Sequence, residues 1–128
     1  MKPTESQIKE RLPIWKALSE FFLDTELQQE NLERIARILA ASDHSEDELE
    51  NILICEVCRG CRINALLPAG EWVSFDEDWL VERIGPYYGR QVWFKRLFIW
   101  RHRWIYDDKW KKVRPRIAEI RAQKIHLC

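Results

Sequence analysis

Apolar residues recur every three or four positions along much of the chain, and this spacing predicts helices. The clearest example lies between residues 27 and 41, where one stripe consists of Leu32, Ile35, Ala36 and Leu39. On a helix of about 3.6 residues per turn these side chains share one face, and the polar residues between them turn to water. That polar face holds Gln28, Gln29, Glu33 and Arg37.

The N-terminal segment carries start signals for two further helices. Thr4 and Gln7 have the spacing of a capping box, in which each side chain accepts a hydrogen bond from the backbone N–H of the other residue. Pro13 suits the first turn of a second helix, because its missing N–H is not needed there. The apolar positions of that second helix are Ile14, Leu18, Phe21 and Phe22, and Asp24-Thr25 then predict a turn.

Two more capping boxes predict helices in the middle of the chain. Ser45 and Glu48 predict a helix over residues 46–59, which Gly60 would end. Ser74 and Glu77 predict a shorter helix through residue 84, where a Gly-Pro pair stops it.

The last third of the chain, rich in tryptophan, also has helical spacing. Its first predicted stripe is Trp93, Leu97, Trp100 and Trp104, which could face either the core or a partner. Asp107-Asp108 would separate it from a final helix with Trp110, Val113, Ile117 and Ile120 inward, kinked or restarted at Pro115. The pattern predicts an all-α fold, a single compact domain over residues 1–128 made of six or seven short helices.

Charge divides the chain into two unequal halves, although Lys+Arg and Asp+Glu both total 21. Residues 1–86 hold 9 basic and 18 acidic side chains, whereas residues 87–128 hold 12 and 3. The halves either neutralise each other within the fold or leave an acidic and a basic face for partners. No stretch has the pattern of an export signal or a membrane span, so we expect a soluble cytoplasmic protein without a membrane partner.

The run "CEVCRGC" raises the question of a metal site. Cys55, Cys58 and Cys61 would spread over about 120° of a continuous helix, too wide to converge on one ion, and no second pair of ligands has suitable spacing. Reduced cysteine packs as a small apolar side chain. We therefore expect the three thiols to pack in the core, with a metal site or a reactive pair as the weaker alternatives, and we expect no cofactor.

Little else in the sequence indicates an enzyme. No phosphate-binding glycine loop, zinc-protease motif or serine-hydrolase motif is present. Carboxylates gather at Glu71, Asp76, Glu77 and Asp78, where they could be an acid/base pair or ligands of a hard metal. The last three are more simply the acidic first turn of a capped helix. A small metal-dependent enzyme is thus the third hypothesis.

The basic, aromatic C-terminal segment predicts nucleic-acid binding as the second hypothesis, because cations contact phosphates and aromatic rings stack on bases. The residues that would do so are Arg96, Arg101, Arg103, Lys109, Lys111, Lys112 and Arg114. A net charge of zero argues against it, since dedicated nucleic-acid binders are usually basic.

Three stretches resemble a family of small, uncharacterised bacterial proteins: "LPIWKALSEFFLDTEL", "ILICEV" and "AGEWVSFDEDWL". The resemblance covers about residues 8–84, and it implies no activity. Its motif residues are Trp15, Leu18, Phe22, Asp24, Thr25, Glu56, Gly70, Glu71, Trp72, Phe75, Asp76 and Trp79.

The leading hypothesis is a non-enzymatic protein-binding module, such as a toxin-neutralising immunity protein or a small adaptor. Its acidic surface would steer and dock onto a basic partner surface. The expected contact residues are Glu20, Glu26, Glu30, Glu33, Asp43, Glu46, Asp47, Glu48 and Glu50.

Overall fold

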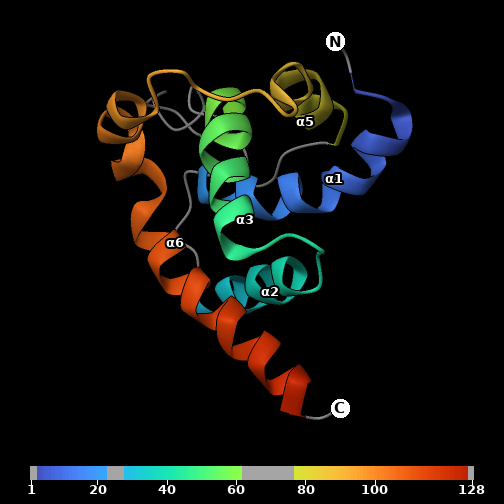
Figure 1. The fold of residues 1–128 in the computed structure, drawn as a ribbon, viewed down its shortest axis with the longest axis vertical. Helices are drawn as coiled ribbons and strands as arrows, with labels where there is room; N and C mark the ends of the chain where they lie inside the picture. The colour runs from blue at the N-terminus through green and yellow to red at the C-terminus, as the bar shows by residue number, and fades with distance from the viewer. Residues whose placement is uncertain (1–2, 23–27, 62–76, 127–128) are drawn as a thin grey trace.

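The computed structural model describes residues 3–22, 28–61 and 77–126, and within these ranges every regular element is helical. The predicted all-α fold is confirmed. α3 (Glu46–Ile52) and its continuation stand at the centre, and the other helices pack around them (Figure 1).

The N-terminal helix α1 (Glu5–Ser19) is one element and not two. The predicted capping box of Thr4 and Gln7 is confirmed, but the predicted helix start at Pro13 is wrong, because Pro13 lies inside α1. The proline removes one backbone hydrogen bond, and the buried face of the helix offsets this loss by packing Trp15 and Leu18 in the core. A 3₁₀ turn, η1 (Glu20–Phe22), follows, whereas the predicted turn at Asp24-Thr25 lies outside the described residues.

The second helix, α2 (Gln29–Ala40), matches its prediction closely. All four residues of the predicted apolar stripe are buried: Leu32, Ile35, Ala36 and Leu39. Its most extensive packing is against the C-terminal helix, which crosses it (Figure 1).

The central helix is longer than the sequence predicts and contains a π-helical turn. The capping box of Ser45 and Glu48 starts α3 as predicted. The π turn, η2 (Leu53–Val57), then inserts one extra residue into the helical repeat, and the N–H of Cys58 donates to the carbonyl of Leu53. All five residues of η2 are buried, and the chain stays helical through Cys61.

Gly60 does not end this helix, and its role is close packing. A Cβ atom at Gly60 would lie 2.8 Å from the carbonyl oxygen of Arg83 and 2.8 Å from Cγ1 of Ile84. Both contacts belong to the end of α5 (Glu77–Ile84), so the missing side chain lets the two helices touch.

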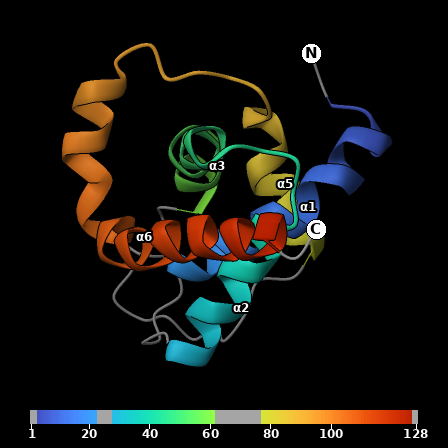
Figure 2. The same ribbon diagram turned by 60° about the horizontal axis from the view of Figure 1, so that its bottom comes forward.

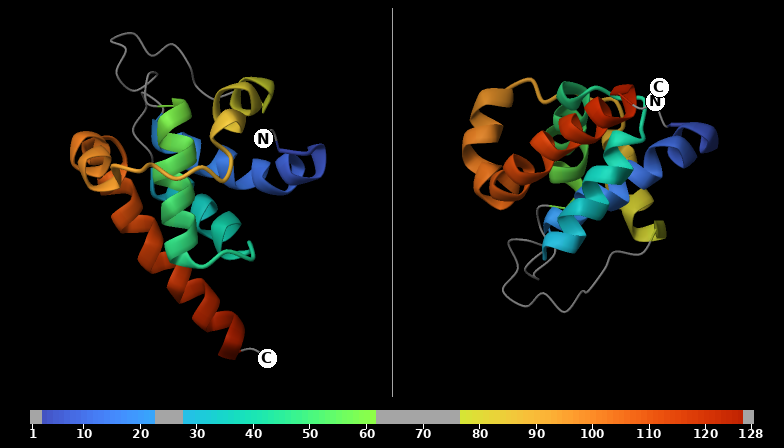
Figure 3. Two further views of the ribbon diagram at one scale, coloured as in Figure 1. Left: turned by 45° about the horizontal axis from the view of Figure 1, so that its top comes forward. Right: turned by 90° about the horizontal axis from the view of Figure 1, so that it is seen from below.

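The segment between α5 and the C-terminal helix crosses over α3 (Figures 1 and 3). α5 ends at the predicted Gly-Pro pair, which continues as the 3₁₀ turn η3 (Gly85–Tyr87). Gly89 has a φ of 68°, a conformation that glycine adopts readily, and its N–H donates to a carboxylate oxygen of Glu56 at 3.1 Å. Ser74, the expected cap of α5, lies outside the described residues.

The C-terminal helix α6 (Lys95–His126) is a single element of 32 residues. The predicted separation at Asp107-Asp108 is therefore wrong, and Pro115 lies within the helix. Figure 2 shows that α6 changes direction along its length, so that its two ends point in different directions. Trp110, Val113 and Ile117 are buried as predicted, and Ile120 packs against the core while partly exposed.

Candidate functional site

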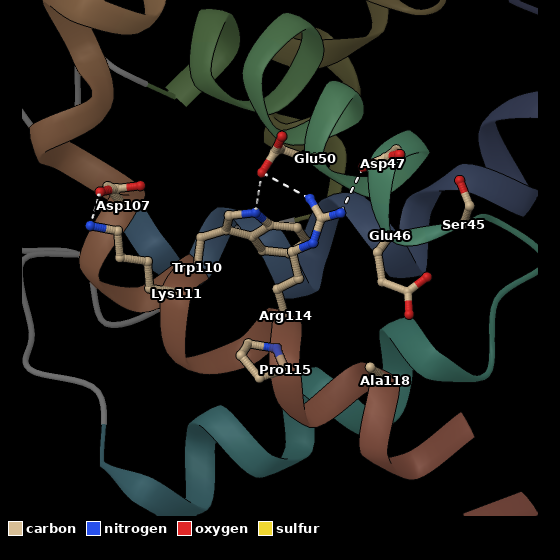
Figure 4. Close-up of a pocket in the computed structure, with 10 residues that line it drawn as sticks. All are labelled: Ser45, Glu46, Asp47, Glu50, Asp107, Trp110, Lys111, Arg114, Pro115 and Ala118. Carbon is tan, nitrogen blue, oxygen red and sulfur yellow. Dashed lines mark hydrogen bonds and ion pairs between the residues drawn. The ribbon is translucent and has the colours of Figure 1, made fainter. Parts of the chain in front are cut away.

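The two oppositely charged halves of the chain meet where α3 faces α6 (Figure 4). Glu50 accepts hydrogen bonds from the indole N–H of buried Trp110 at 2.7 Å and from Arg114 at 3.1 Å. Arg114 also contacts Asp47 at 2.6 Å, so its guanidinium joins two carboxylates of α3. An open groove of about 630 Å³ runs along this contact, with Pro115 and other α6 residues on one side.

A second set of charge pairs joins α2 to α6. Arg116 makes two hydrogen bonds to the carboxylate of Glu33, at 2.7 and 2.8 Å. The hydrogen bonds from Arg116, and a weaker one from Arg37, lower the pKa of Glu33 from 4.5 to about 2 in spite of partial desolvation. Together with the α3 contacts, these pairs form a charged seam along α6, made of Glu33, Glu46, Asp47, Glu50, Arg114, Arg116 and Arg121.

Arg121, the last arginine of the charged seam along α6, caps the C-terminal end of α2. Its guanidinium donates to the carbonyl oxygens of Leu39 at 3.2 Å, Ala40 at 3.3 Å and Ser42 at 3.2 Å, and to the carboxylate of Glu46 at 3.1 Å. The last carbonyl groups of a helix have no partner within the helix, so one side chain satisfies several of them.

Most of the acidic residues expected to bind a partner are used inside the molecule. Four belong to the charged seam, and Glu20 pairs with Arg34. The carboxylate of Glu48 accepts a hydrogen bond from the backbone N–H of Ser45 at the start of α3 and pairs with His44. Glu30 and Asp43 are exposed and form no ion pair with a described residue, and Glu26 lies outside the described ranges. Most of these acidic side chains are therefore paired within the molecule, although that of Asp47 is still 86% exposed.

The basic residues expected to bind nucleic acid are divided in a similar way. Arg103 and Lys111 both pair with Asp107, Arg114 belongs to the charged seam, and Lys109 donates to the carbonyl oxygen of Phe21 at 2.8 Å. The remaining three, Arg96, Arg101 and Lys112, are exposed and take part in no ion pair among the described residues.

Large apolar side chains are exposed at the start of α6 and in the two residues before it, which answers the open question of whether the tryptophan stripe is core or surface. Trp93 is 91% exposed and Trp100 is 73% exposed, and the same surface includes Phe94, Leu97 and Trp104. We call these five residues the aromatic face. The buried side of this part of α6 consists instead of Phe98, Ile105 and Tyr106.

The aromatic face borders a pocket of about 430 Å³. Its apolar lining includes Val92, Leu97 and Phe98. Arg59, which lies over the ring of Tyr87 at 4.2 Å, and Arg101 also line it, and no carboxylate lines the pocket among the described residues. The surface thus combines exposed rings with cations.

The three cysteines are buried, as predicted for core packing. Burial raises the pKa of the Cys61 thiol to about 12, which keeps it protonated and unreactive near neutral pH. Within the described ranges, no group of three or more His, Cys, Asp or Glu side chains is placed to hold a metal ion.

Glu56, one of the motif residues, is the buried centre of a polar network. It is 4% exposed, and both of its oxygens lie 2.8 Å from Arg11. The indole N–H of Trp15 and the backbone N–H of Gly89 are its other partners among the described residues, at 2.9 and 3.1 Å. Because these contacts are all internal, we assign Glu56 to the scaffold.

Of the four carboxylates considered for acid/base chemistry, Glu71 and Asp76 lie outside the described residues. Glu77 and Asp78 form the first turn of α5, where Glu77 pairs with Lys16 at 2.8 Å.

No helix among the described residues is long and apolar enough to cross a membrane.

The fold and these surfaces define an all-α protein with an internal acid–base seam and an exposed aromatic face. More particularly, the chain belongs to the family described as a domain of unknown function (DUF7079), whose model matches residues 9–116. This agrees with the resemblance to an uncharacterised family. No curated protein and no solved structure matches the chain.

Proposed function

We propose that this protein is a non-enzymatic protein-binding module and that the aromatic face of α6 is its contact surface. The proposal rests on the exposure of five large apolar side chains on one segment. Most other large apolar residues in the described part of the chain are buried in the core. Large exposed apolar patches usually mark sites of interaction. Tryptophan and arginine, which this surface combines, are the residues most enriched in the energetic centres of protein interfaces.

The aromatic face is a better candidate than the acidic surface expected from the sequence. Four of the acidic residues already neutralise arginines of α6, so a partner would compete with these arginines for their carboxylates. The side chains of the aromatic face are already exposed to solvent, so a partner can contact them without displacing an ion pair.

Nucleic acid is a weaker candidate for this surface. Of the seven basic residues considered for phosphate contacts, three form internal ion pairs and Lys109 is directed at a backbone carbonyl. Few cations remain to neutralise a phosphate backbone, which supplies most of the affinity in such complexes.

Within the class of protein-binding modules, our more specific proposal is a toxin-neutralising immunity protein or a small adaptor of bacterial origin. Its support is an analogy of size and fold class with such proteins. Membership of a family of unknown function adds no activity to this analogy.

Photo-crosslinking in the cells that encode the protein tests the proposal. We expect p-benzoylphenylalanine in place of Trp100 to yield one dominant protein adduct, and the same group in place of Gln29, exposed on α2, to yield none. Replacing Trp104 with Glu in the Trp100-labelled protein should abolish the adduct, since a charge at the centre of an apolar contact opposes binding. Equal adducts from both positions, or none from either, would refute the proposal.

A further inference from the structure

The arginines of α6 and its neighbours fall into two groups, those with and those without a carboxylate partner among the described residues. Arg114, Arg116 and Arg121 of α6 all form ion pairs with carboxylates of α2 or α3. In contrast, Arg59 and Arg101, which line the pocket beside the aromatic face, form no ion pair with a described residue. No described carboxylate therefore neutralises the two guanidinium groups of this pocket.

Apolar side chains and both arginines line this pocket. Val92, Leu97 and Phe98 are among its apolar residues, and His102 also lines it. Its volume of about 430 Å³ lies at the lower end of the range typical of ligand sites, which suits one or two large side chains. No carboxylate is among the described residues that line the pocket, so its charge is positive.

Resting on the proposed function, we infer that this pocket binds an acidic segment of a partner protein, with one or two large apolar side chains inserted beside Leu97 and carboxylates on Arg59 and Arg101. Guanidinium groups bind carboxylates with two parallel hydrogen bonds, and such pairs fix the register of a bound segment. The electrostatic complementarity raises the association rate, and the apolar anchor slows dissociation.

An acidic peptide fits this surface better than a nucleic acid. A single strand would need a line of cations along its backbone, whereas these two arginines line a single pocket. The interior offers aliphatic and aromatic carbon, with Trp93 and Phe94 already packed edge-to-face at 4.9 Å. This interior matches an apolar side chain more closely than a phosphodiester.

A displayed library of random peptides about 12 residues long, selected on the full-length protein, tests the inference. We expect the enriched sequences to place Asp or Glu next to Leu, Phe or Trp. The affinity of the best peptide should fall about tenfold or more when Arg59 and Arg101 are both changed to Gln, since paired charges at an interface contribute strongly. Leu97→Ala should have a similar effect.

The matched control is the double variant Lys112→Gln and Lys124→Gln. It removes the same charge from exposed positions farther along α6, and it should change the affinity less than about twofold. A loss as large as that of the arginine variant would overturn the inference, because the effect would then come from net charge alone. Circular dichroism of each variant verifies that the helices are intact.

Three further probes distinguish other occupants, and a positive result from any of them would overturn the inference. Oligothymidylate that competes with the peptide at about 150 mM salt would point to nucleic acid. Sedimentation of anionic phosphatidylglycerol vesicles with the protein, lost in Leu97→Ala, would point to a lipid surface. Self-association lost in the same variant would point to a second copy of the chain.

The result at Trp100 separates the failure of this inference from that of the proposed function. If the crosslinked adduct forms but the selected peptides are neutral or basic, protein binding stands and the acidic segment is refuted. If the adduct is missing and no selected peptide depends on Leu97, both proposals fail.

Discussion

Gly60 illustrates how one missing side chain decides the packing of two helices. The carbonyl of Arg83 and the side chain of Ile84 occupy the space that a Cβ atom would need. The carbonyl belongs to the backbone, so it cannot move aside without displacing the end of α5. A position that reads as a helix breaker in the sequence is a helix contact in the fold.

We therefore expect Gly60→Ala to destabilise the protein by about 1–3 kcal/mol, the usual cost of overpacking. The measurement is the free energy of unfolding from urea titration monitored by circular dichroism. Gly85→Ala is the matched control, because no atom lies within 4 Å of a Cβ at Gly85, and its effect should be near neutral. Equal losses in the two variants would contradict the packing role.

Trp110 offers a test of the contact between α3 and α6. Trp110→Phe keeps an aromatic ring in the core but removes the N–H that donates to Glu50 at 2.7 Å. We expect a loss of about 1–3 kcal/mol in the free energy of unfolding, because a hydrogen bond to a charged group is lost and the ring becomes smaller.

The control for this variant is Trp104→Phe. The indole N–H of Trp104 donates to the carbonyl of Arg101 at 3.1 Å, but the side chain is exposed. Water can replace that contact, so the stability should change by less than about 0.5 kcal/mol. A larger loss for Trp104→Phe than for Trp110→Phe would mean that the two faces of α6 are assigned the wrong way round.

At the scale of whole elements, the continuity of α6 decides which side of its first half is buried, a question that the sequence left open. The helical character of the segment was predictable, but the assumed break at Asp107-Asp108 uncoupled its two parts. On one continuous helix Val113 lies nine positions after Trp104, which places it about 180° around the axis. Since Val113 is buried, the continuous helix turns Trp104 to solvent.

Other elements were predictable because their signals are local. The capping boxes at Thr4 and Ser45 and the apolar stripe of α2 depend on residues close in sequence. The π turn and the contact of Gly60 with α5 depend on distant packing, which has no local signature. The same reason applies to the candidate site: its residue types were visible, but their exposure depends on which face of α6 meets the core.

Fluorescence quenching measures the exposure of the aromatic face directly. The chain has seven tryptophans, of which Trp15 and Trp110 are buried while Trp93, Trp100 and Trp104 are exposed. Changing the three exposed tryptophans to Phe should remove most of the emission that acrylamide quenches easily, without changing the far-ultraviolet circular dichroism. An unchanged quenching profile would contradict the exposed face.

For the whole molecule, the charged seam links the acidic and basic halves and makes folding sensitive to acid. The folded pKa of Glu33, about 2, lies below its ordinary value of 4.5. The unfolded chain therefore takes up a proton at a higher pH than the folded one. The stabilisation by Glu33 is complete above about pH 5 and is lost as the pH falls toward 2.

We expect Glu33→Gln to flatten the loss of unfolding free energy between about pH 5 and pH 2. The measurement is a series of urea titrations across that range. Glu30→Gln is the control, because Glu30 is exposed on the same helix and has no ion pair with a described residue. If the unfolding free energy of both variants falls with pH as steeply as that of the wild type, the pairing of Glu33 with Arg116 does not contribute to acid sensitivity.

The cap that Arg121 places on α2 also sets an order of events during synthesis. The guanidinium and the carbonyl of Ala40 are 81 residues apart in the chain. A ribosome adds about 5–20 residues per second, so the end of α2 exists for several seconds before its cap has been made. During that interval the acidic helices have been translated without the arginines that neutralise them, and the native arrangement of α2 is completed only when the last turns of α6 arrive.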